Sequence, residues 1–583
     1  MWGSGLVAII RKIEISNFRS IKNFTWHPRP GFNCLIGAGD VGKTSILDAI
    51  DLCLGARRNA VFTDSDFFNL EVTSPIEIVL VLGLLDDSLK WLDSYGEFLC
   101  GYSADNDEIE DEPGNGLETV LCMQLKVQQD LEPVWTLLSA RAAAKGIERN
   151  LKWADRERIA PLRIGSTSDT HLAWRRGSIL NKLSEETPDA SAALTSAARD
   201  ARTNFGDDAG TQLKDALDVV DKTASGHGID VGSGTRAMLD AHTVSFGSGS
   251  IALHSGNGVP VKGMGTGSKR LLIAGMQKVA SQANSIILID EVEIGLEPHR
   301  IIRFLKSLGS KNSESNMQVF ATSHAPTVLQ ELSFDQVFLV RQHLDEGKTK
   351  ILPIPPEAQG SLRAFPASFL AKSVIICEGK TEIGFIRGLD QFRVEKKEKD
   401  SIEAAGTSLL DCDGGSIERP FERADVFLSL GYRVAVFIDN DREIPGPESE
   451  AFIDAGGKLF HWEDGQAIED AIILSATDAV IGSILEAAEA LNDFDDDFLY
   501  NRLSSESGGK LTFADAKSAA EEEMLDENEI AWIAKAAGGK KRGWFKDIGR
   551  MESLAKNVIA PNFKSFDKEF KTVTKSLIKW AQN

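Results

Sequence analysis

A glycine-rich segment near the N-terminus has the spacing of a phosphate-binding loop. Residues 37–44 read GAGDVGKT, which fits the pattern G-x-x-x-x-G-K-[ST]. In such a loop the glycines let backbone N–H groups curl around phosphates, the lysine reaches the β- and γ-phosphates, and the hydroxyl serves Mg²⁺. We therefore expect ATP and Mg²⁺ to bind here. The expected contacts are Gly37, Gly39, Gly42, Lys43, Thr44 and Ser45.

Two acids at the end of an apolar segment form a second chemical feature. Residues 285–291 read SIILIDE and predict a buried strand that ends in Asp290 and Glu291. Phosphoryl transfer depends on positioning and charge neutralisation, so we expect Asp290 to hold Mg²⁺ and Glu291 to orient the attacking water. The alternative is a buried strand capped by surface acids, which the nearby phosphate loop disfavours.

Three further segments indicate an ABC-type ATPase. Residues 265–270 (GTGSKR) open a predicted helix, where Gly265 and Gly267 would contact the γ-phosphate of a nucleotide held by another subunit. Residues 316–325 predict a strand that ends at His324, the place of the switch histidine in ABC heads. A lone histidine is more often structural. Residues 295–299 (GLEPH) lie where the D-loop belongs.

Carboxylates also end two strands in the C-terminal half. Glu378 follows the apolar residues 373–377, and Asp439 and Asp441 follow residues 433–438. The carboxyl ends of parallel strands meet at one edge of a sheet, and alternate residues of an extended chain point the same way. Hard oxygen ligands suit Mg²⁺ or Mn²⁺, and two such ions can assist phosphodiester cleavage. Residues 411–413 repeat the D-x-D pattern but are disfavoured, because no apolar strand is predicted before them.

Two later segments extend this second centre. Residues 466–472 predict a helix start that carries Glu469 and Asp470, and Glu469 is a further candidate ligand. Residues 539–547 (GKKRGWFKD) gather cations around two aromatic residues. A lysine there could neutralise charge on the scissile phosphate, or it could contact the backbone of a nucleic acid.

The spacing of the motifs predicts how the 583 residues are divided. Between Thr44 and Gly265 the chain is longer than a compact P-loop domain requires, and residues 176–225 have the helical spacing of an inserted arm. The prolines of residues 353–366 indicate a linker. The expected division is an ATPase formed by residues 1–130 and 241–352, an inserted helical region 131–240, a linker 353–367 and a second α/β domain 368–583.

The charge of the chain is divided unevenly. The net charge is −23, which by itself disfavours a nucleic-acid partner. Residues 540–583 nevertheless hold eleven Lys or Arg against four Asp or Glu. Two interpretations of this basic segment remain open: a local surface that attracts phosphate, and a solvated helical face. We expect no membrane span and no signal peptide, and six scattered cysteines fit a reducing cytoplasm.

The order of these motifs resembles the OLD (overcoming lysogenization defect) family of ATP-dependent nucleases, which includes the nuclease subunit of the Gabija anti-phage system. The resemblance covers the chain from Ile13 to about Lys546. It implies an α/β fold, in which an ABC-type P-loop head with an inserted helical dimerisation arm precedes a Toprim α/β domain with helical additions. It also implies homodimers or higher oligomers, DNA as substrate, ATP, and Mg²⁺ or Mn²⁺ at both sites. A helicase-like or other defence-system partner would act beside some members.

By this resemblance the Toprim domain is a metal-dependent endonuclease, often with nicking activity. The implied metal ligands are Glu378, Glu382, Asp439, Asp441 and Glu469. Lys546 would be the catalytic lysine, and Lys541 is its rival. The chain departs from the family at Gly39, where asparagine is frequent, and in its GTGSKR signature. Three alternatives remain: a repair ATPase with a structural Toprim module, a topoisomerase-like or primase-like enzyme, and a nucleotide-sensing switch.

Overall fold

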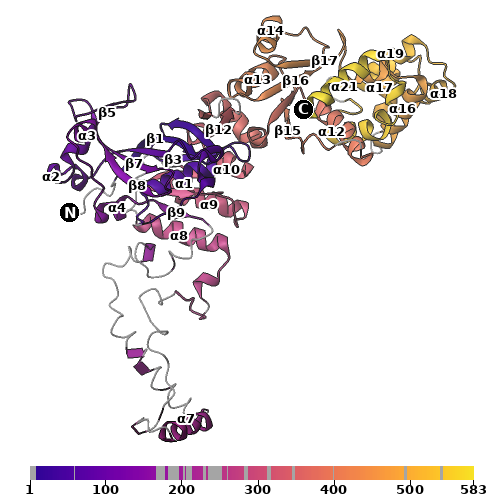
Figure 1. Cartoon of the computed structure of the whole chain (residues 1–583). Coiled ribbons are helices and arrows are strands. Elements are labelled where there is room, and N and C mark those ends of the chain that lie inside the picture. The colour runs from indigo at the N-terminus through magenta and orange to yellow at the C-terminus, as the bar shows by residue number, and fades with distance from the viewer. Residues whose placement is uncertain are drawn as a thin grey trace. The chain divides into compact units, whose positions relative to one another are not determined.

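The computed structural model describes residues 8–57, 59–165, 213–226, 260–280, 286–311, 317–343, 348–397, 400–491, 496–538 and 543–582, with short stretches between residues 172 and 258. The chain forms two compact units (Figure 1). The first contains Met1–Leu35, Gly42–Ser323 and Gln342–Lys350. The second contains Ile36–Val41, His324–Arg341 and Ile351–Asn583.

Antiparallel strands build one part of a 13-stranded sheet in the first unit. Alternating burial in β1 places one apolar row in the core, as expected for a strand with one covered face. A turn with Arg19 at φ 50° separates β1 (Ile9–Phe18) from β2 (Ile21–Trp26), and the two strands pair antiparallel. The strands, in spatial order, are β6 (Glu108–Glu110), β5 (Leu99–Ser103), β7 (Glu118–Val127), β4 (Ile76–Gly83), β1 (Ile9–Phe18) and β2 (Ile21–Trp26), and β8 (Pro133–Leu138) also pairs with β7.

Parallel strands build the nucleotide-binding part of the same sheet. β3 (Phe32–Ile36), β11 (Gln318–Thr322) and β10 (Ile286–Ile289) are buried along their whole length, which explains their continuous apolar sequences. β9 (Leu162–Ile164) pairs with β10 and therefore belongs to this sheet, although residues 131–240 were expected to be a helical insertion. The neighbouring helices are α1 (Lys43–Leu54), α3 (Ala140–Ala144), α4 (Trp153–Ile159), α8 (Thr266–Ala280) and α9 (Pro298–Ser307).

The expected insertion is described only in part. Helix α7 (Lys214–Gly226) confirms helical structure near the end of residues 176–225, and most of that segment lies outside the described residues. The expected linker, residues 353–367, is folded instead of extended. It contains helix α11 (Gln359–Ala364), flanked by two short 3₁₀ helices, and its Leu362 is fully buried in the second unit. Apolar residues between the prolines therefore give this segment a packed structure.

A four-stranded parallel sheet forms the centre of the second unit. Its spatial order is β15 (Thr407–Asp411), β14 (Ser373–Cys377), β16 (Arg433–Ile438) and β17 (Lys458–His461). β15 was not expected, because only two of its five side chains are fully buried. The helices that follow are α12 (Lys380–Glu395), α13 (Arg419–Ser429), α14 (Gly446–Asp454), α15 (Ile468–Leu474), α20 (Ile548–Leu554) and α21 (Lys568–Gln582).

A separate group of four helices extends this unit. Figure 1 shows α16 (Asp478–Leu491), α17 (Asp496–Glu506), α18 (Phe513–Glu521) and α19 (Glu527–Gly538) together at one end. Their apolar faces join the core beneath β14 and β16, so the helical group and the sheet share one hydrophobic core. This arrangement agrees with the expected α/β domain with helical additions.

Two glycines bring helices α12 and α20 into close backbone contact. A Cβ at Gly384 would lie 2.6 Å from the carbonyl oxygen of Ile548, and a Cβ at Gly388 would overlap the carbonyl oxygen of Glu552. These glycines are one helical turn apart and therefore lie on the same face of α12. Their missing side chains allow α20, which begins directly after Lys546 and Asp547, to pack against the helix that carries Glu382.

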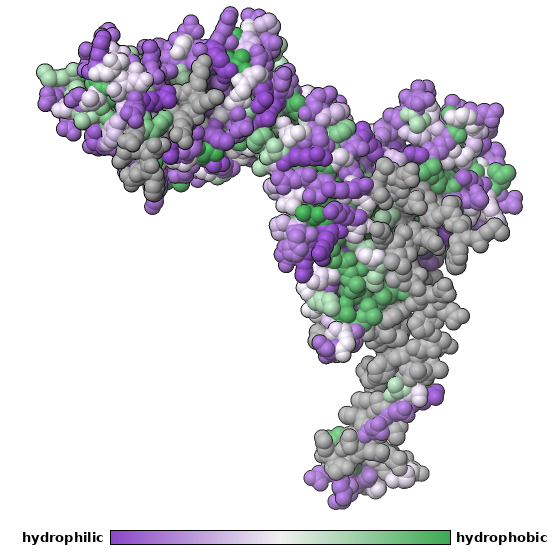
Figure 2. Space-filling view, turned by 180° about the vertical axis from the view of Figure 1, so that it is seen from behind, coloured by the Kyte–Doolittle hydropathy of each residue, from purple (hydrophilic) through white to green (hydrophobic). Residues whose placement is uncertain are grey.

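Hydrophilic residues cover most of the face drawn in Figure 2, with hydrophobic residues in smaller groups between them. Within the described part of the chain, no helix combines the length and the apolar composition needed to cross a membrane.

Candidate nucleotide site and metal-binding carboxylates

The loop between β3 and α1 needs glycine at two positions. Gly37 has φ 142° and Gly42 has φ 92°, values that L-residues with side chains rarely adopt. A Cβ at Gly37 would also lie 2.6 Å from the carbonyl oxygen of Val340. Gly39 lacks these constraints, since a Cβ there would meet no atom within 4 Å. Lys43 is buried at the first position of α1, next to Thr44, which is the geometry expected of a phosphate-binding loop.

Asp290 connects the loop to the strand ends of the sheet. Its Oδ1 accepts hydrogen bonds from the Thr44 hydroxyl at 3.2 Å and from the Thr322 hydroxyl at 2.6 Å. The backbone N–H of Glu291 donates to the same Thr322 hydroxyl at 2.8 Å, and the Glu291 side chain is exposed. Thr44 and Asp290 thus stand together, as Mg²⁺ coordination requires. Thr322, at the end of β11, is a contributor that the sequence reasoning missed.

Arg270 holds the loop that follows Asp290. Its side chain is 1% exposed and donates to the carbonyl oxygens of Asp290 at 3.1 Å and of Glu291 and Ile294 at 2.9 Å. Burial lowers the pKa of Arg270, although nearby carboxylates oppose the change. Sequence reasoning missed this role, because arginine within GTGSKR resembles a surface cation. Arg270 therefore fixes the signature helix against the acidic strand end.

The signature segment itself requires a small residue. A Cβ at Gly267 would overlap the carbonyl oxygen of Gly295, so the start of α8 and the GLEPH loop approach backbone to backbone. Gly265 directly precedes α8, which begins at Thr266. His324 follows β11 and is exposed. The segments expected to form the ATPase site thus have the predicted strand and helix contexts.

In the second unit, three backbone hydrogen bonds fix the carboxylates at the edge of the parallel sheet. The N–H of Glu378 donates to the carbonyl oxygen of Phe437 at 3.1 Å, and the N–H of Asp439 donates to Glu378 Oε2 at 3.2 Å. Glu382 lies in the first turn of α12, where its Oε2 accepts from the N–H of Gly379 at 2.7 Å. Glu378, Glu382 and Asp439 are thereby positioned at one edge.

Helix α15 contributes a fourth carboxylate. The backbone N–H of Ile468 donates to Asp439 Oδ1 at 2.9 Å, which places the neighbouring Glu469 beside Asp439. Glu469 is 1% exposed, and its Oε2 accepts from Lys546 Nζ at 3.3 Å. Lys546 thus reaches this set of four carboxylates, whereas Lys541 lies outside the described residues. We call Glu378, Glu382, Asp439 and Glu469 the carboxylate set.

The carboxylate set is electrostatically strained. Burial, with added repulsion from Glu378 and Glu469, raises the pKa of Glu382 to about 7. Burial and the other three carboxylates raise the pKa of Asp439 well above its ordinary value. Burial also raises the pKa of Glu469, although Lys546 opposes this change. For Lys546 burial lowers the pKa, but attraction to Glu469, Asp439 and Glu382 outweighs it, so its pKa is raised.

Asp441 does not join the carboxylate set in the expected way. β16 ends at Ile438, and Asp439 is buried whereas Asp441 is exposed, so the two side chains do not share one environment as strand alternation predicted. Asp441 is exposed and lies 3.5 Å from Arg442, which also pairs with Glu378. The negative charge of Asp441 instead contributes to the raised pKa of Asp470, after burial as the main cause. The charge of Asp441 therefore acts on Asp470, and both residues lie beside the carboxylate set.

The donors fit a hard divalent cation. In the described parts of the chain, no three His, Cys, Asp or Glu side chains are already drawn together as a closed metal site. The carboxylate set nevertheless offers buried oxygens that share negative charge, and Lys546 Nζ, at 3.2–3.3 Å from the two oxygens of Glu469, is the cation that faces them. Oxygen donors of this kind suit Mg²⁺ or Mn²⁺ better than softer metals. Glu378, Asp439 and Glu469 are the side chains that would hold such an ion.

The rejected D-x-D copy also ends a strand at this edge. Asp411 is the last residue of β15 and lies opposite Cys377 in the parallel register. The reason given for rejecting residues 411–413 was therefore wrong. Asp413 is directed elsewhere, because it pairs with Lys380 at 3.1 Å and is largely exposed. Neither aspartate contributes to the raised pKa values of the carboxylate set.

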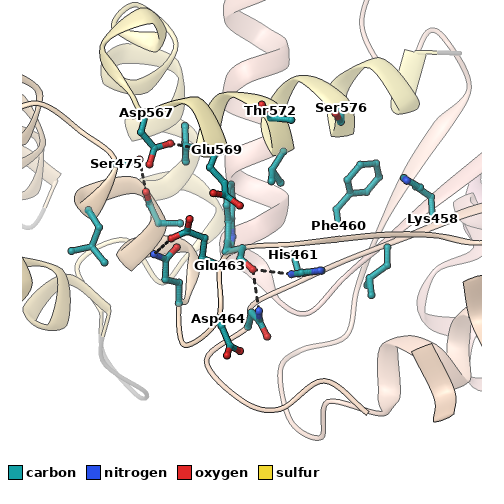
Figure 3. A pocket seen from close by; sticks show the side chains of 18 residues that line it. Lys458, Phe460, His461, Glu463, Asp464, Ser475, Asp567, Glu569, Thr572 and Ser576 are labelled. Atoms are coloured by element: carbon teal, nitrogen blue, oxygen red, sulfur yellow. Dashed lines mark hydrogen bonds between the residues drawn. The ribbon is translucent and has the colours of Figure 1, made fainter. Parts of the chain in front are cut away.

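Asn440 connects the carboxylates to a neighbouring cavity of about 830 Å³. Its amide donates to the carbonyl oxygen of Trp462 at 3.0 Å, and its backbone bonds to Gly465 and Gln466, which fixes the loop before α15. Figure 3 shows the acidic side chains of this cavity, among them Glu463 and Glu569. A hydrogen bond shared with Glu569 raises the pKa of Glu463. This cavity therefore repels phosphate, in contrast to a nucleic-acid channel.

Family comparisons match both halves of the chain. Residues 9–112 match a model described as an AAA ATPase domain. Residues 132–330 match an AAA domain model described with the AbiEii toxin and type IV TA systems. Residues 369–441 match the model of the overcoming lysogenization defect protein-like TOPRIM domain, which ends at Asp441. The two halves are therefore ATPase domains and a Toprim domain.

Individual proteins match less of the chain. A segment of 48 residues is 42% identical to DNA replication and repair protein RecF from Moorella thermoacetica, and it spans 8% of this chain and 13% of that protein. The Smc head domain of Pyrococcus furiosus with an extended coiled coil, solved with the C-terminal domain of ScpA, has 14% identity and a TM-score of 0.34, and the match covers 61% of this chain and 98% of that chain. The SMC head domain from Thermotoga maritima has 13% identity and a TM-score of 0.28, with 59% and 99% covered.

Proposed function

We propose, from the premise that this chain is an OLD-family ATPase–Toprim protein, that it is an ATP-binding, metal-dependent DNA endonuclease or nickase. The observation that carries this proposal is the carboxylate set beside Lys546. Burying three acids beside a fourth that is half-buried costs free energy, so a site of this kind is retained for chemistry more readily than for stability. The ATPase domains alone do not account for it.

The residues of the Toprim site have distinct roles in this proposal. Glu378, Asp439 and Glu469 hold Mg²⁺ or Mn²⁺, and Glu382 supports Glu378 from the first turn of α12. A divalent ion bound there supplies positive charge to the scissile phosphate and lowers the pKa of a bound water. Lys546, held at Glu469, stabilises the negative charge that develops on the reacting phosphate. Asp441 and Asp470 provide carboxylates for a second ion.

The ATPase domains regulate this site in the proposal. ATP binds at Lys43 and Thr44 with Mg²⁺ at Asp290, and Glu291 orients water for hydrolysis. The signature at residues 265–270 requires a nucleotide held by a second subunit, so we propose a homodimer or a higher homo-oligomer, with His324 as the switch residue. We further propose a cytoplasmic location and a role in anti-phage defence or DNA repair. In that role the protein would act together with a helicase-like partner, as in the Gabija system.

A plasmid assay tests the proposed activity. Supercoiled DNA is incubated with the full chain and Mg²⁺ or Mn²⁺, with and without ATP, and nicked and linear products are separated on a gel. We expect metal-dependent nicking that Asp439→Asn abolishes. Asp413→Asn is the matched control, because Asp413 also ends a D-x-D segment but points away from the carboxylate set. Nicking by Asp439→Asn at the wild-type rate would refute the assigned site.

One observation favours a second function. Lys546 and Arg442 already pair with Glu469 and Glu378, which partly balances the charge of the carboxylate set without a metal. A Toprim domain balanced in this way could be structural, and the protein would then be an ATP-driven DNA-binding switch or a repair ATPase. ATP-dependent DNA binding without any metal-dependent cleavage would support this alternative.

A further inference from the structure

The basic C-terminal segment forms one side of a cavity of about 490 Å³ between α12 and α21. Its rim carries Arg393 from α12 and Lys564, Lys575 and Lys579 from the C-terminal segment. No Asp or Glu lines it, although the chain as a whole has a net charge of −23. We call this cavity the basic groove.

Among the described residues, three of the five other cations of residues 540–583 are already neutralised. Lys546 pairs with Glu469, Arg550 with Asp547 and Lys556 with Glu395. By contrast, the three lysines of the basic groove form no ion pair with a carboxylate among the described residues, and all three are exposed. Their positive charge is therefore available to a ligand.

The floor of the basic groove combines apolar surface with one polar atom. Leu389, Phe392, Phe563 and Ile578 provide aliphatic and aromatic surface. Thr574 also lines the groove, is 3% exposed, and its hydroxyl has no hydrogen-bond partner. A buried hydroxyl without a partner costs free energy, so its retention points to a ligand that supplies one. Lysines, a hydroxyl and aromatic rings together suit a nucleotide, whose phosphate meets the cations and whose sugar or base meets the floor.

The place of the groove on α12 relates it to the cutting site. Glu382 and Arg393 lie on the same helix, eleven residues apart. At a rise of 1.5 Å per residue this separation is about 17 Å along the helix axis. Successive phosphates of one strand advance by about 3.4 Å along the axis of a DNA duplex, and they lie farther apart in an extended single strand, so the groove lies a few nucleotides from the carboxylate set.

We infer that the basic groove binds a nucleotide of the DNA strand a few positions from the phosphate that is cut. The choice of DNA as the ligand rests on the proposed nuclease function, whereas the description of the groove does not depend on it. The groove anchors the strand, and the carboxylate set acts on it at the other end of α12. The cations position the strand through its backbone and carry no sequence information.

Strand binding tests the inference separately from cleavage. A fluorescent single-stranded oligonucleotide of about 16 nucleotides is titrated with the full chain in EDTA, and its anisotropy is measured between about 50 and 200 mM salt. We expect Lys575→Glu/Lys579→Glu to weaken binding at least tenfold and to reduce the log–log salt slope by about 1.4. Thr574→Val, which removes the hydroxyl and little else, should weaken binding roughly tenfold.

Lys458→Glu/Lys510→Glu is the charge-matched control, because both lysines are exposed in the same unit and outside the basic groove. Thermal unfolding and ATP turnover confirm that each variant is folded. Equal binding by wild type and Lys575→Glu/Lys579→Glu, or an equal loss in the control, would overturn the inference. Displacement of the oligonucleotide by an equal concentration of free dAMP would also overturn the inference, because it would indicate a site for a mononucleotide. If wild type cuts no plasmid but the groove variants still lose strand binding, the groove stands and the nuclease proposal falls.

Discussion

Replacing Glu382 by glutamine should stabilise the metal-free protein at high pH. Burial, Glu378 and Glu469 raise the pKa of Glu382 from 4.5 to about 7. A raised carboxyl pKa means that the stability is complete below pH 4.5 and is lost as the pH rises toward 7. Above that range the ionised side chain costs the folded state about 3 kcal/mol. Glutamine removes this cost and can still accept the hydrogen bond from Gly379.

Denaturant titration in EDTA, followed by tryptophan fluorescence, measures the difference. Trp462 and Trp544 are buried in the core of the second unit and report its unfolding. We expect Glu382→Gln to exceed wild type by about 3 kcal/mol near pH 8.5 and by only about 1 kcal/mol near pH 5.5. The control is Glu450→Gln, an exposed carboxylate of α14.

Adding Mn²⁺ should reverse the ranking of wild type and Glu382→Gln. Ligand that binds only the folded state stabilises it by mass action, and the wild-type carboxylates bind the ion more tightly than the variant. A Glu382→Gln protein whose stability equals wild type near pH 8.5, or whose difference is independent of pH, would refute the electrostatic reasoning about the carboxylate set.

Four other changes have defined outcomes. Lys546→Ala should keep Mn²⁺ binding, measured by calorimetry, but slow nicking by about 10²–10³-fold, and an unchanged rate would exclude its role at the phosphate. Gly267→Ala should abolish ATP hydrolysis, because its Cβ would overlap the carbonyl oxygen of Gly295; normal turnover would contradict the close approach. Glu291→Gln should retain ATP binding and lose hydrolysis, and wild-type hydrolysis would disprove its assignment. Gly384→Ala should displace α20 and Lys546 and reduce nicking, whereas Gly446→Ala, with no atom within 4 Å of the new Cβ, should not; equal effects would argue against the packing account.

Local sequence patterns were sufficient for the strand ends and loops that carry chemistry. The phosphate loop, the strand before Asp290 and the strands before Glu378 and Asp439 are set by short apolar runs and glycine spacing, which depend little on the rest of the chain. Glu469 was identified from its place at a predicted helix start and Glu382 through the family resemblance, and the structure brings both beside Asp439.

Features that depend on contacts between distant segments could not be predicted. Arg270 resembles a surface cation until the carbonyl oxygens of residues 290–294 surround it. β15 is only partly apolar, so its position beside β14 appears only in the sheet. Asp441 was grouped with Asp439 by strand alternation, but the strand ends at Ile438 and Asp441 is exposed. Each case depends on tertiary packing, which overrides the local pattern.

The packing of α20 against Gly384 and Gly388 has a consequence for how the protein is made. In the proposed function the cutting site uses Asp439, Glu469 and Lys546, and Lys546, which precedes α20, is synthesised 107 residues after Asp439. At about 5–20 residues per second, a ribosome takes about 5–20 s to add this stretch. The segments of the nucleotide-binding unit end at Lys350, so they leave the ribosome much earlier. A nascent chain therefore contains its nucleotide-binding segments well before it can assemble a complete cutting site. The order of the segments along the chain thus delays the nuclease activity until the end of synthesis.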